Sequence, residues 1–306
     1  MSYRYFIYGL HVESEIEIDE AMMDNQDQVT DVMVKLGGMP NEVREKLGEQ
    51  KSSMVALIHK RDGLCFRVPE VGDYMVEEGC ITISPFIDAT SQPIKTFLLG
   101  SAFGYCMVLR KKVVMHGGAV EHNGKGIIVT GESGAGKSTV TNALRERGYL
   151  FIADDVCALE EDGEKMHISM AYPQQKLCRD AALKMGYDLS ELIYINEHRD
   201  KFAVRLKEGV LPEGADFSFL FELRLAGDGK FSYQKVEGHE KLFTIIRNIY
   251  RGESAFDMWG MPPEYMKRCL KIASTIEVYQ INRPADMNAL GEIMNIITEK
   301  IENNKN

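Results

Sequence analysis

The sequence predicts an α/β protein with a mixed sheet, preceded by a smaller α+β region. Three observations predict this class: a glycine-rich loop between a β-branched run and a helix-like segment, an Asn-Gly pair just before that loop, and two adjacent aspartates after the next β-prone run. A chain of 306 residues has room for one large domain or two modest ones. We expect the division to fall between residues 1–95 and 96–306.

Composition and charge exclude several classes of protein. Hydrophobic residues make up 44% of the chain and charged residues 27%, which is ordinary globular usage. The 36 basic and 46 acidic residues give a net charge of −10, so the surface as a whole does not favour binding to nucleic acid. The six cysteines form no C-x-x-C pair, which favours reduced thiols over disulfides or a zinc site.

Targeting and membrane signals are not expected in this sequence. Residues 1–15 lack the basic start and apolar stretch of a signal peptide. The most apolar run, Thr96–Leu109, has 14 uncharged residues, fewer than the ~20 that span a bilayer. We expect this run to form a buried helix of a cytoplasmic protein.

Short β-prone runs separated by turn signals occupy the first 95 residues. Tyr3–Tyr8 is rich in aromatic residues, and Ile81–Ile83 is β-branched. This region carries no motif that indicates chemistry. We therefore expect it to serve in packing, oligomerisation or substrate recruitment, for which the two runs would offer sheet edges to a peptide.

Regular alternation of elements begins near residue 96. Asn123-Gly124 predicts a two-residue hairpin between a strand that starts at Val113 and the strand Gly126–Thr130. A helix is predicted over Ser138–Arg147, with Gly148 as its stop. Further predicted elements are strands at Tyr149–Ala153, Phe217–Leu225 and Glu277–Ile281 and an amphipathic helix from Pro284 onward.

The segment Gly131–Ser138 fits the phosphate-loop pattern G-x-x-x-x-G-K-[ST], and it follows a strand and opens a helix, as that pattern requires. Glycines allow backbone N–H groups to turn towards phosphate oxygens, and a helix N-terminus adds partial positive charge. Lys137 would bridge the β- and γ-phosphates, and Ser138 would ligate Mg²⁺. The loop predicts a site for ATP with Mg²⁺ made by Gly131, Glu132, Ser133, Gly134, Ala135, Gly136, Lys137, Ser138 and Thr139.

Two adjacent carboxylates, Asp154 and Asp155, begin 17 residues after Lys137. We expect the strand Tyr149–Ala153 to lie beside the strand of the loop, parallel to it, and to deliver both carboxylates to the phosphates. Adjacent strand residues point to opposite faces, so one aspartate would hold Mg²⁺ while the other accepts a proton from an attacking hydroxyl. The sequence leaves open which aspartate takes which role.

His116 is the third element of the predicted site. If Asn123 and Gly124 are the central residues of the hairpin turn, the residue numbers of each pair sum to 247, and His116 faces Gly131. A histidine at this place can stabilise phosphoryl charge or orient the nucleophile. The predicted catalytic residues are therefore Asp154, Asp155, His116 and Lys137.

The order of these motifs resembles the catalytic domain of the HPr kinase/phosphorylase family, which is related to phosphoenolpyruvate carboxykinases. The resemblance covers residues 115–157 and includes His116-Gly117, the phosphate loop, Arg147-Gly148-Tyr149 and Ala153-Asp154-Asp155. It implies a P-loop kinase fold with a mixed sheet that transfers the γ-phosphoryl group of ATP to a serine. It also implies that the two aspartates supply the general base and a metal ligand, with His116 nearby.

The sequence departs from that family in two ways. Thr139 stands where the family has glutamate, and the chain has no counterpart of the Gly-Arg-Asn-rich C-terminal loop that is tied to HPr recognition and phosphorolysis. The layout of the whole chain is similar instead to HPr-kinase-like proteins of peptide natural-product clusters, including lasso-peptide kinases. That similarity involves Tyr8-Gly9-Leu10, Leu98-Leu99-Gly100, Pro173–Leu177 and Val278-Tyr279.

The leading hypothesis is an ATP-dependent phosphotransferase that acts on a serine of a peptide or small protein, of the lasso-peptide precursor type. A kinase of free serine or a related hydroxyl compound and a non-catalytic ATP-binding module are the alternatives. A membrane partner is not expected, and a homo-oligomer is left open. Basic side chains often clamp phosphoryl groups, which makes Lys176, Lys201 and Arg247 candidate phosphate or substrate contacts.

Overall fold

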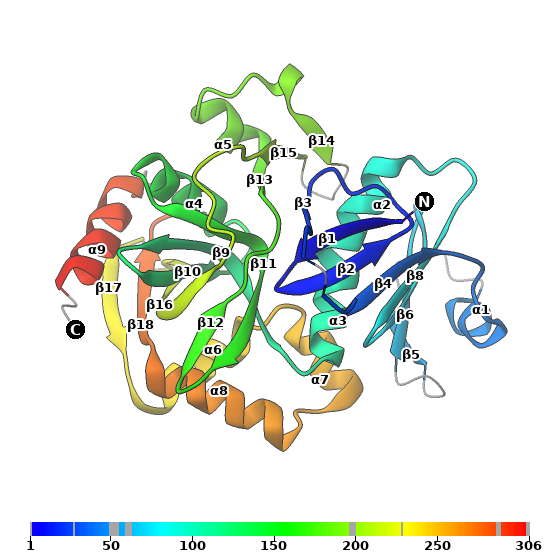
Figure 1. Ribbon diagram of the computed structural model, residues 1–306. Helices are drawn as coiled ribbons and strands as arrows, with labels where there is room; N and C mark the ends of the chain where they lie inside the picture. Colours follow the sequence, from blue (N-terminus) through cyan, green and yellow to red (C-terminus); the bar gives the residue numbers. More distant parts are fainter. Residues whose placement is uncertain are drawn as a thin grey trace. The chain divides into compact units, whose positions relative to one another are not determined.

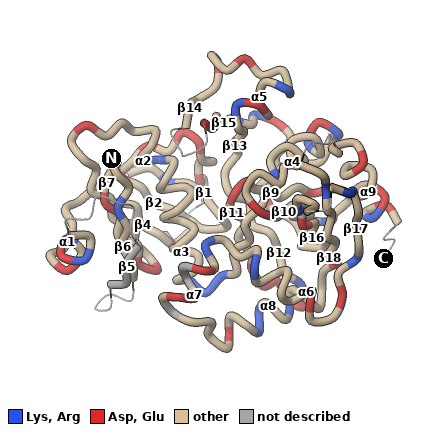
Figure 2. Tube along the Cα trace, turned by 180° about the vertical axis from the view of Figure 1, so that it is seen from behind, with Lys and Arg blue, Asp and Glu red and all other residues tan. Residues whose placement is uncertain are grey.

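The computed structural model describes residues 2–26, 28–48, 55–58, 63–195, 200–227, 229–285 and 289–303, with 55–58, 254, 255 and 259 described by their backbone. The chain divides into two units, Met1–Lys112 with Tyr194–Lys201 and Val113–Ile193 with Phe202–Asn306 (Figure 1). Figure 2 shows acidic and basic residues interspersed along both units. The net charge of −10 is thus spread along the chain.

The first unit contains a mixed eight-stranded sheet in the order β3-β1-β2-β4-β8-β7-β6-β5. Two of its strands, β1 and β8, are those expected from the β-prone runs. Because β8 lies between β4 and β7, the prediction that Ile81–Ile83 offers a sheet edge is wrong. β1 pairs with β2 along its length and with β3 at Tyr5 and Phe6, so the prediction that Tyr3–Tyr8 offers a sheet edge is also wrong. The elements of this part are β1 (Tyr3–Ile7), β2 (Leu10–Ser14), β3 (Met22–Met23), β4 (Val32–Leu36), α1 (Asn41–Leu47), β5 (Val55–Ile58), β6 (Gly63–Val68), β7 (Gly72–Glu77) and β8 (Cys80–Pro85).

The apolar run near residue 100 is helical and buried, as predicted. It comprises α2 (Ser91–Phe97), a π-helical turn (Leu98–Ala102) and α3 (Phe103–Leu109). The Tyr8 hydroxyl donates to Leu99 O at 2.9 Å, and the Tyr74 hydroxyl donates to Ile94 O at 3.0 Å. These contacts bind the helices to the first unit, so the unit boundary follows Lys112 instead of residue 95. Among the helices of the described residues, none combines the length and apolar character needed to cross a membrane.

A mixed seven-stranded sheet forms the centre of the second unit, in the order β10-β9-β11-β12-β16-β18-β17. β10 also pairs with β16 in parallel, so β10, β9, β11, β12 and β16 form a closed ring. This arrangement confirms the predicted α/β class with a mixed sheet. The strands are β9 (Val113–His122), β10 (Lys125–Gly131), β11 (Leu150–Asp162), β12 (Lys165–Ile168), β16 (Ala215–Leu225), β17 (Ser232–Val236) and β18 (Glu277–Arg283).

The hairpin between β9 and β10 has the predicted turn and register. Asn123 and Gly124 have φ values of 53° and 76°, the left-handed conformation that a tight two-residue turn requires. Pairing runs from Lys125 opposite His122 to Thr130 opposite Gly117. Each pair has residue numbers that sum to 247, as expected.

Helices cover both faces of the second sheet (Figure 1). Apolar side chains of β10 and β16 pack against α4 and α9 in one cluster that includes Val129, Val140 and Ile297. The expected C-terminal helix begins at Leu290, and residues 286–288 before it lie outside the described residues. The other elements are α4 (Lys137–Glu146), β13 (Gln174–Cys178), α5 (Arg179–Lys184), a 3₁₀ turn (Leu189–Glu191), β14 (Ile193–Ile195), β15 (Lys201–Arg205), α6 (Gly238–Arg247), α7 (Gly252–Trp259), α8 (Pro263–Thr275) and α9 (Leu290–Asn303).

Candidate active site

The phosphate loop joins the end of β10 to the start of α4, as its sequence pattern predicts. Gly131, Gly134 and Gly136 have φ values of 133°, 88° and 104°, which side chains rarely tolerate. A Cβ atom on Gly131 would lie 2.1 Å from Leu223 O of the neighbouring strand β16. Glycine at this position is therefore required by both the backbone conformation and the close approach of β16.

Lys137 folds back across the loop. Its Nζ donates to Gly131 O at 2.8 Å and to Glu132 O at 3.1 Å. Ser138 and Thr139 follow in the first turn of α4. The ammonium group thus lies at the start of the loop and the helix N-terminus at its end, and both offer positive charge to an anion.

The two aspartates lie within a continuous strand. β11 runs from Leu150 to Asp162, so the prediction of a strand that ends at Ala153 is wrong. Asp154 pairs with Gly118 and Asp155 with Gly117 of β9. β9 therefore lies between β10 and β11, which corrects the expectation that β10 and β11 are neighbours. Both run antiparallel to β9, so they are parallel to each other, as expected.

Glycines on β9 allow α4 and β10 to approach this strand closely. A Cβ atom on Gly118 would lie 2.4 Å from Thr141 Oγ1 of α4, and one on Gly117 would lie 2.5 Å from Val129 O. The Gly118 face of the sheet is thus turned towards α4. Because Asp154 pairs with Gly118, its side chain lies on the same face as α4.

β13 connects Asp154 to the beginning of α4. The buried Asp154 carboxylate accepts a hydrogen bond from Lys176 N at 2.7 Å through Oδ2. The neighbouring Gln175 donates through Nε2 to Ser138 O at 3.2 Å, and its Oε1 accepts from Arg145 at 2.9 Å. This strand therefore fixes the carboxylate with respect to the first turn after the loop.

Asp155 contacts two of the predicted site residues. His116 Nδ1 lies 3.1 Å from Asp155 O and 3.4 Å from Asp155 Oδ1. Lys176 Nζ lies 3.7 Å from Asp155 Oδ2, and its side chain is 5% exposed. Asp155 has a φ of 69°, a costly conformation for a residue other than glycine. The structure thus brings Asp155, His116 and the candidate cation Lys176 together.

The backbone of His116 is held on both sides. Its N–H donates to Asn248 O at 2.8 Å, and its carbonyl accepts from Thr130 Oγ1 at 2.6 Å. The imidazole packs against the Tyr250 ring with centroids 5.9 Å apart. The pairing of β9 with β10 ends at Thr130 opposite Gly117, so the position of His116 opposite Gly131 stays a prediction. Asn248 and Tyr250 were not identified from the sequence, because this segment carries no motif.

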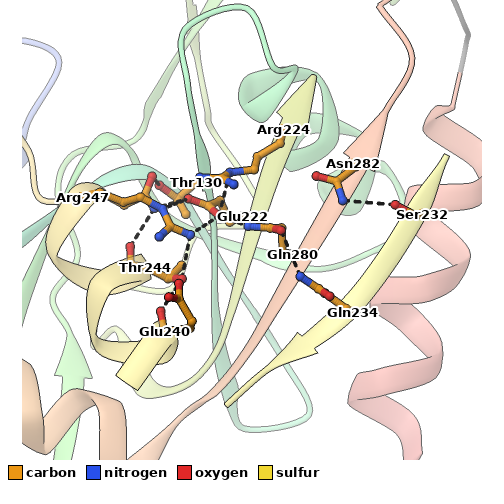
Figure 3. A network of polar contacts seen from close by, with 11 residues as sticks. Thr130, Glu222, Arg224, Ser232, Gln234, Glu240, Thr244, Arg247, Gln280 and Asn282 are labelled. Carbon is orange, nitrogen blue, oxygen red and sulfur yellow. Dashed lines mark hydrogen bonds and ion pairs between the residues drawn. The ribbon is translucent and has the colours of Figure 1, made fainter. Parts of the chain in front are cut away.

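Arg247 belongs to a polar network that includes Glu222 and Gln280 (Figure 3). Its Nε and Nη2 donate to the two carboxylate oxygens of Glu222, both at 2.7 Å. Asn248 and Gln280 donate to the same carboxylate at 2.7 and 2.9 Å. The structure therefore pairs Arg247 with Glu222. Lys201 lies in the segment 194–201 that groups with the first unit, and its predicted contact with phosphate stays a prediction.

Glu222 is ionised in this setting. Burial acts to raise the pKa of its carboxyl group, but the hydrogen bonds from Arg247, Gln280 and Asn248 outweigh burial and lower the pKa. A lowered pKa in the folded state stabilises the protein above the ordinary glutamate pKa, and this contribution is lost as the pH falls through the folded-state value.

Replacement of Glu222 by glutamine is expected to lower the free energy of unfolding by ~1.5–3 kcal/mol, the usual worth of hydrogen bonds to a charged group. The loss should be largest near neutral pH and should shrink as the pH falls from the ordinary glutamate pKa through the lowered folded-state pKa, where wild-type Glu222 also becomes protonated. Urea unfolding at several pH values measures it. Glu161→Gln, which removes the carboxylate of a surface ion pair with Arg268, is the matched control and should cost under ~1 kcal/mol. Equal effects of the two substitutions at every pH would contradict this account of the network.

The residues present fit a magnesium ion that arrives with a nucleotide. Magnesium in such sites is held by one or two carboxylates together with phosphates, seldom by protein ligands alone. The described residues contain no cluster of three or more His, Cys, Asp or Glu that could hold a metal by itself. The Asp154 carboxylate and the Ser138 hydroxyl are oxygen donors of the required kind, and β13 contacts both residues.

Comparisons with known proteins match the region that contains these residues. Residues 107–178 match the family model described as HPr Serine kinase C-terminal domain. An HPr kinase/phosphorylase of Chlorobium luteolum is 44% identical over 54 residues, which are 18% of this chain and 16% of that protein. An HPr kinase/phosphorylase of Mycoplasmopsis pulmonis is 28% identical over 126 residues, or 41% of this chain and 36% of that protein. The matched part is thus well under half of the length of these relatives.

A solved structure, the Hpr(Ser) kinase/phosphatase from Coxiella burnetii, aligns with 62% of this chain and 91% of its own, at 14% identity and a TM-score of 0.33. The match to the family model includes the phosphate loop, His116 and both aspartates, and it extends on both sides of the stretch 115–157 that carries the resemblance. The expected resemblance is therefore confirmed. Residues 107–178 of this chain form an HPr-kinase-like segment.

Proposed function

We propose that this chain transfers the γ-phosphoryl group of ATP to a serine hydroxyl on a peptide or small protein. The observation that best supports this proposal is the contact of Asp155 with both His116 and Lys176 in a unit that also carries the phosphate loop. A module that only binds ATP has no need for a carboxylate in a strained conformation between a histidine and a buried lysine. Such strain is typical of functional sites.

The phosphate loop supplies the nucleotide site in this proposal. Its backbone N–H groups and Lys137 Nζ bind the β- and γ-phosphates, and the helix N-terminus of α4 stabilises their charge. Asp154 and Ser138 hold Mg²⁺, which neutralises negative charge on the phosphates. We assign the metal to Asp154 because its side chain lies on the α4 face, and because β13 connects it to Ser138.

Asp155 serves as the general base in this proposal. It accepts the proton of the serine hydroxyl as the serine oxygen forms a bond to the γ-phosphorus and the bond to the ADP oxygen breaks. The Lys176 ammonium, 3.7 Å away, places a positive charge beside this carboxylate. The contact between His116 Nδ1 and Asp155 O, a group that can only accept, requires the proton on Nδ1 and so orients the ring.

A peptide acceptor is supported by the layout resemblance to peptide kinases and by the large first unit, which the phosphate chemistry does not require. The names of the curated relatives likewise refer to a kinase of a protein, HPr. Neither run considered for peptide binding forms an edge strand, because β8 lies between β4 and β7 and β1 lies between β3 and β2, so this proposal assigns no sheet edge to the peptide.

The acceptor test compares a serine-ended peptide with free serine, using the full chain, ATP and Mg²⁺. We expect kcat/KM for the peptide to be roughly 100-fold higher, which corresponds to ~2.8 kcal/mol of additional transition-state binding. The same peptide with alanine in place of serine is the control and should receive no phosphate. Equal or faster turnover of free serine would show that the chain is a small-molecule kinase.

A further inference from the structure

Arg283, the last residue of β18, contacts the phosphate loop. Its Nε donates to Ala135 O at 2.8 Å and its Nη2 donates to Gly134 O at 3.1 Å. Its Nη1 donates to Pro284 O at 3.1 Å, which fixes the guanidinium relative to its own backbone. One arginine thus binds two consecutive carbonyl groups in the middle of the loop.

Sheet topology explains how a residue almost 150 positions away reaches the loop. β16 lies between β10 and β18 and pairs in parallel with both. Gly131 lies opposite Leu223, and Leu225 lies opposite Arg283. The carboxyl ends of the three strands therefore lie along one edge of the sheet, where ligands of such sheets bind. Ala226 N donates to Arg283 O at 2.7 Å and anchors the arginine backbone at this edge.

The backbone geometry of an anion-binding loop leaves its carbonyl groups in need of hydrogen-bond donors. When successive N–H groups turn inward towards an anion, the carbonyls between them turn outward and need donors of their own. An arginine side chain offers several N–H donors in a rigid planar fork, which suits two neighbouring carbonyls. Arg283 meets this need at Gly134 and Ala135.

We infer that Arg283 is a positioning residue that holds the phosphate loop in its anion-binding conformation before a nucleotide arrives. This inference rests on the proposed nucleotide site, but it does not depend on the identity of the acceptor or on phosphoryl transfer. Without the arginine, the loop must be ordered by the nucleotide itself, and the nucleotide is bound more weakly as a result.

Two substitutions of Arg283 separate the effect of its planar set of N–H donors from the effect of its positive charge. Arg283→Met removes both, whereas Arg283→Lys keeps a positive charge that cannot span two carbonyls in the same way. We expect Arg283→Met to weaken ATP binding by roughly 10–100-fold, as the loss of hydrogen bonds from a charged donor implies. Arg283→Lys should recover less than half of that loss on a logarithmic scale. Because the loop is ordered once ATP is bound, kcat at saturating ATP should fall by less than about threefold.

Isothermal titration of full-length protein with ATP and Mg²⁺ measures the binding, and thermal unfolding without nucleotide monitors the fold. Arg268→Met is the matched control, because Arg268 on α8 forms an ion pair with Glu161 on β11, and neither residue belongs to the loop. Weakened binding by both Arg283 variants, with the unfolding temperature of Arg283→Lys unchanged, supports the inference even if no acceptor is ever phosphorylated. ATP binding equal to wild type in Arg283→Met and Arg283→Lys would overturn it while leaving the kinase proposal intact. Absence of ATP binding by the wild type would overturn both.

Discussion

Replacement of Lys137 by alanine is expected to abolish phosphoryl transfer. Its Nζ lies against the carbonyls of Gly131 and Glu132, at the start of the loop that we assign to the β- and γ-phosphates. The substitution removes a preorganised positive charge from the transferring group, at a cost of at least ~3 kcal/mol of transition-state stabilisation. Steady-state kinetics should therefore show kcat/KM for ATP reduced by at least ~100-fold.

Lys165→Ala is a suitable control for this experiment. Lys165 is two-thirds exposed on β12 and pairs with Asp216, so its removal should leave kcat/KM within about twofold of wild type. Near-normal turnover by Lys137→Ala would contradict the assignment of the phosphate loop.

The aspartates should respond differently to replacement by asparagine. Asp155→Asn removes the proposed general base while retaining shape, so kcat should fall by roughly 10²–10⁴-fold at any Mg²⁺ concentration. Asp154→Asn removes a proposed metal ligand, so its activity should require more Mg²⁺ and should recover in part as Mg²⁺ is raised. ATP binding by Asp155→Asn should be close to wild type.

Titration of each variant with Mg²⁺ at saturating ATP distinguishes the two roles. Recovery of Asp155→Asn by excess Mg²⁺, with no recovery of Asp154→Asn, would exchange the roles assigned to the two residues. Full activity of both variants would exclude these aspartates from the reaction.

Local chemistry made part of the fold predictable. The Asn123-Gly124 turn and the strand on each side of it depend on neighbouring residues, so the sequence indicated the register that places Gly117 opposite Thr130. The phosphate loop was equally predictable, since its glycines adopt the left-handed conformations that the motif requires. Both features involve fewer than 20 consecutive residues.

Non-local pairing was the part that the sequence did not reveal. Nothing in Leu150–Asp162 indicates that β9 separates β11 from β10, because a hairpin motif does not say what pairs with its other edge. Arg247 was predicted as a phosphate or substrate contact, but its partner Glu222 lies on a distant strand that carries no motif. The sequence does not indicate the contact of Arg283 with the loop for the same reason, since this contact depends on the order of three parallel strands.

The most direct test of the central claim is a transfer assay with γ-labelled ATP, Mg²⁺ and a serine-ended peptide, in which label on the peptide and formation of ADP are both measured. We expect the wild type to form one labelled serine for each ADP, and Asp155→Asn to do so at a rate at least ~100-fold lower. The central claim would be contradicted if the wild type bound ATP but labelled no serine acceptor, or if Asp155→Asn labelled the peptide at the wild-type rate.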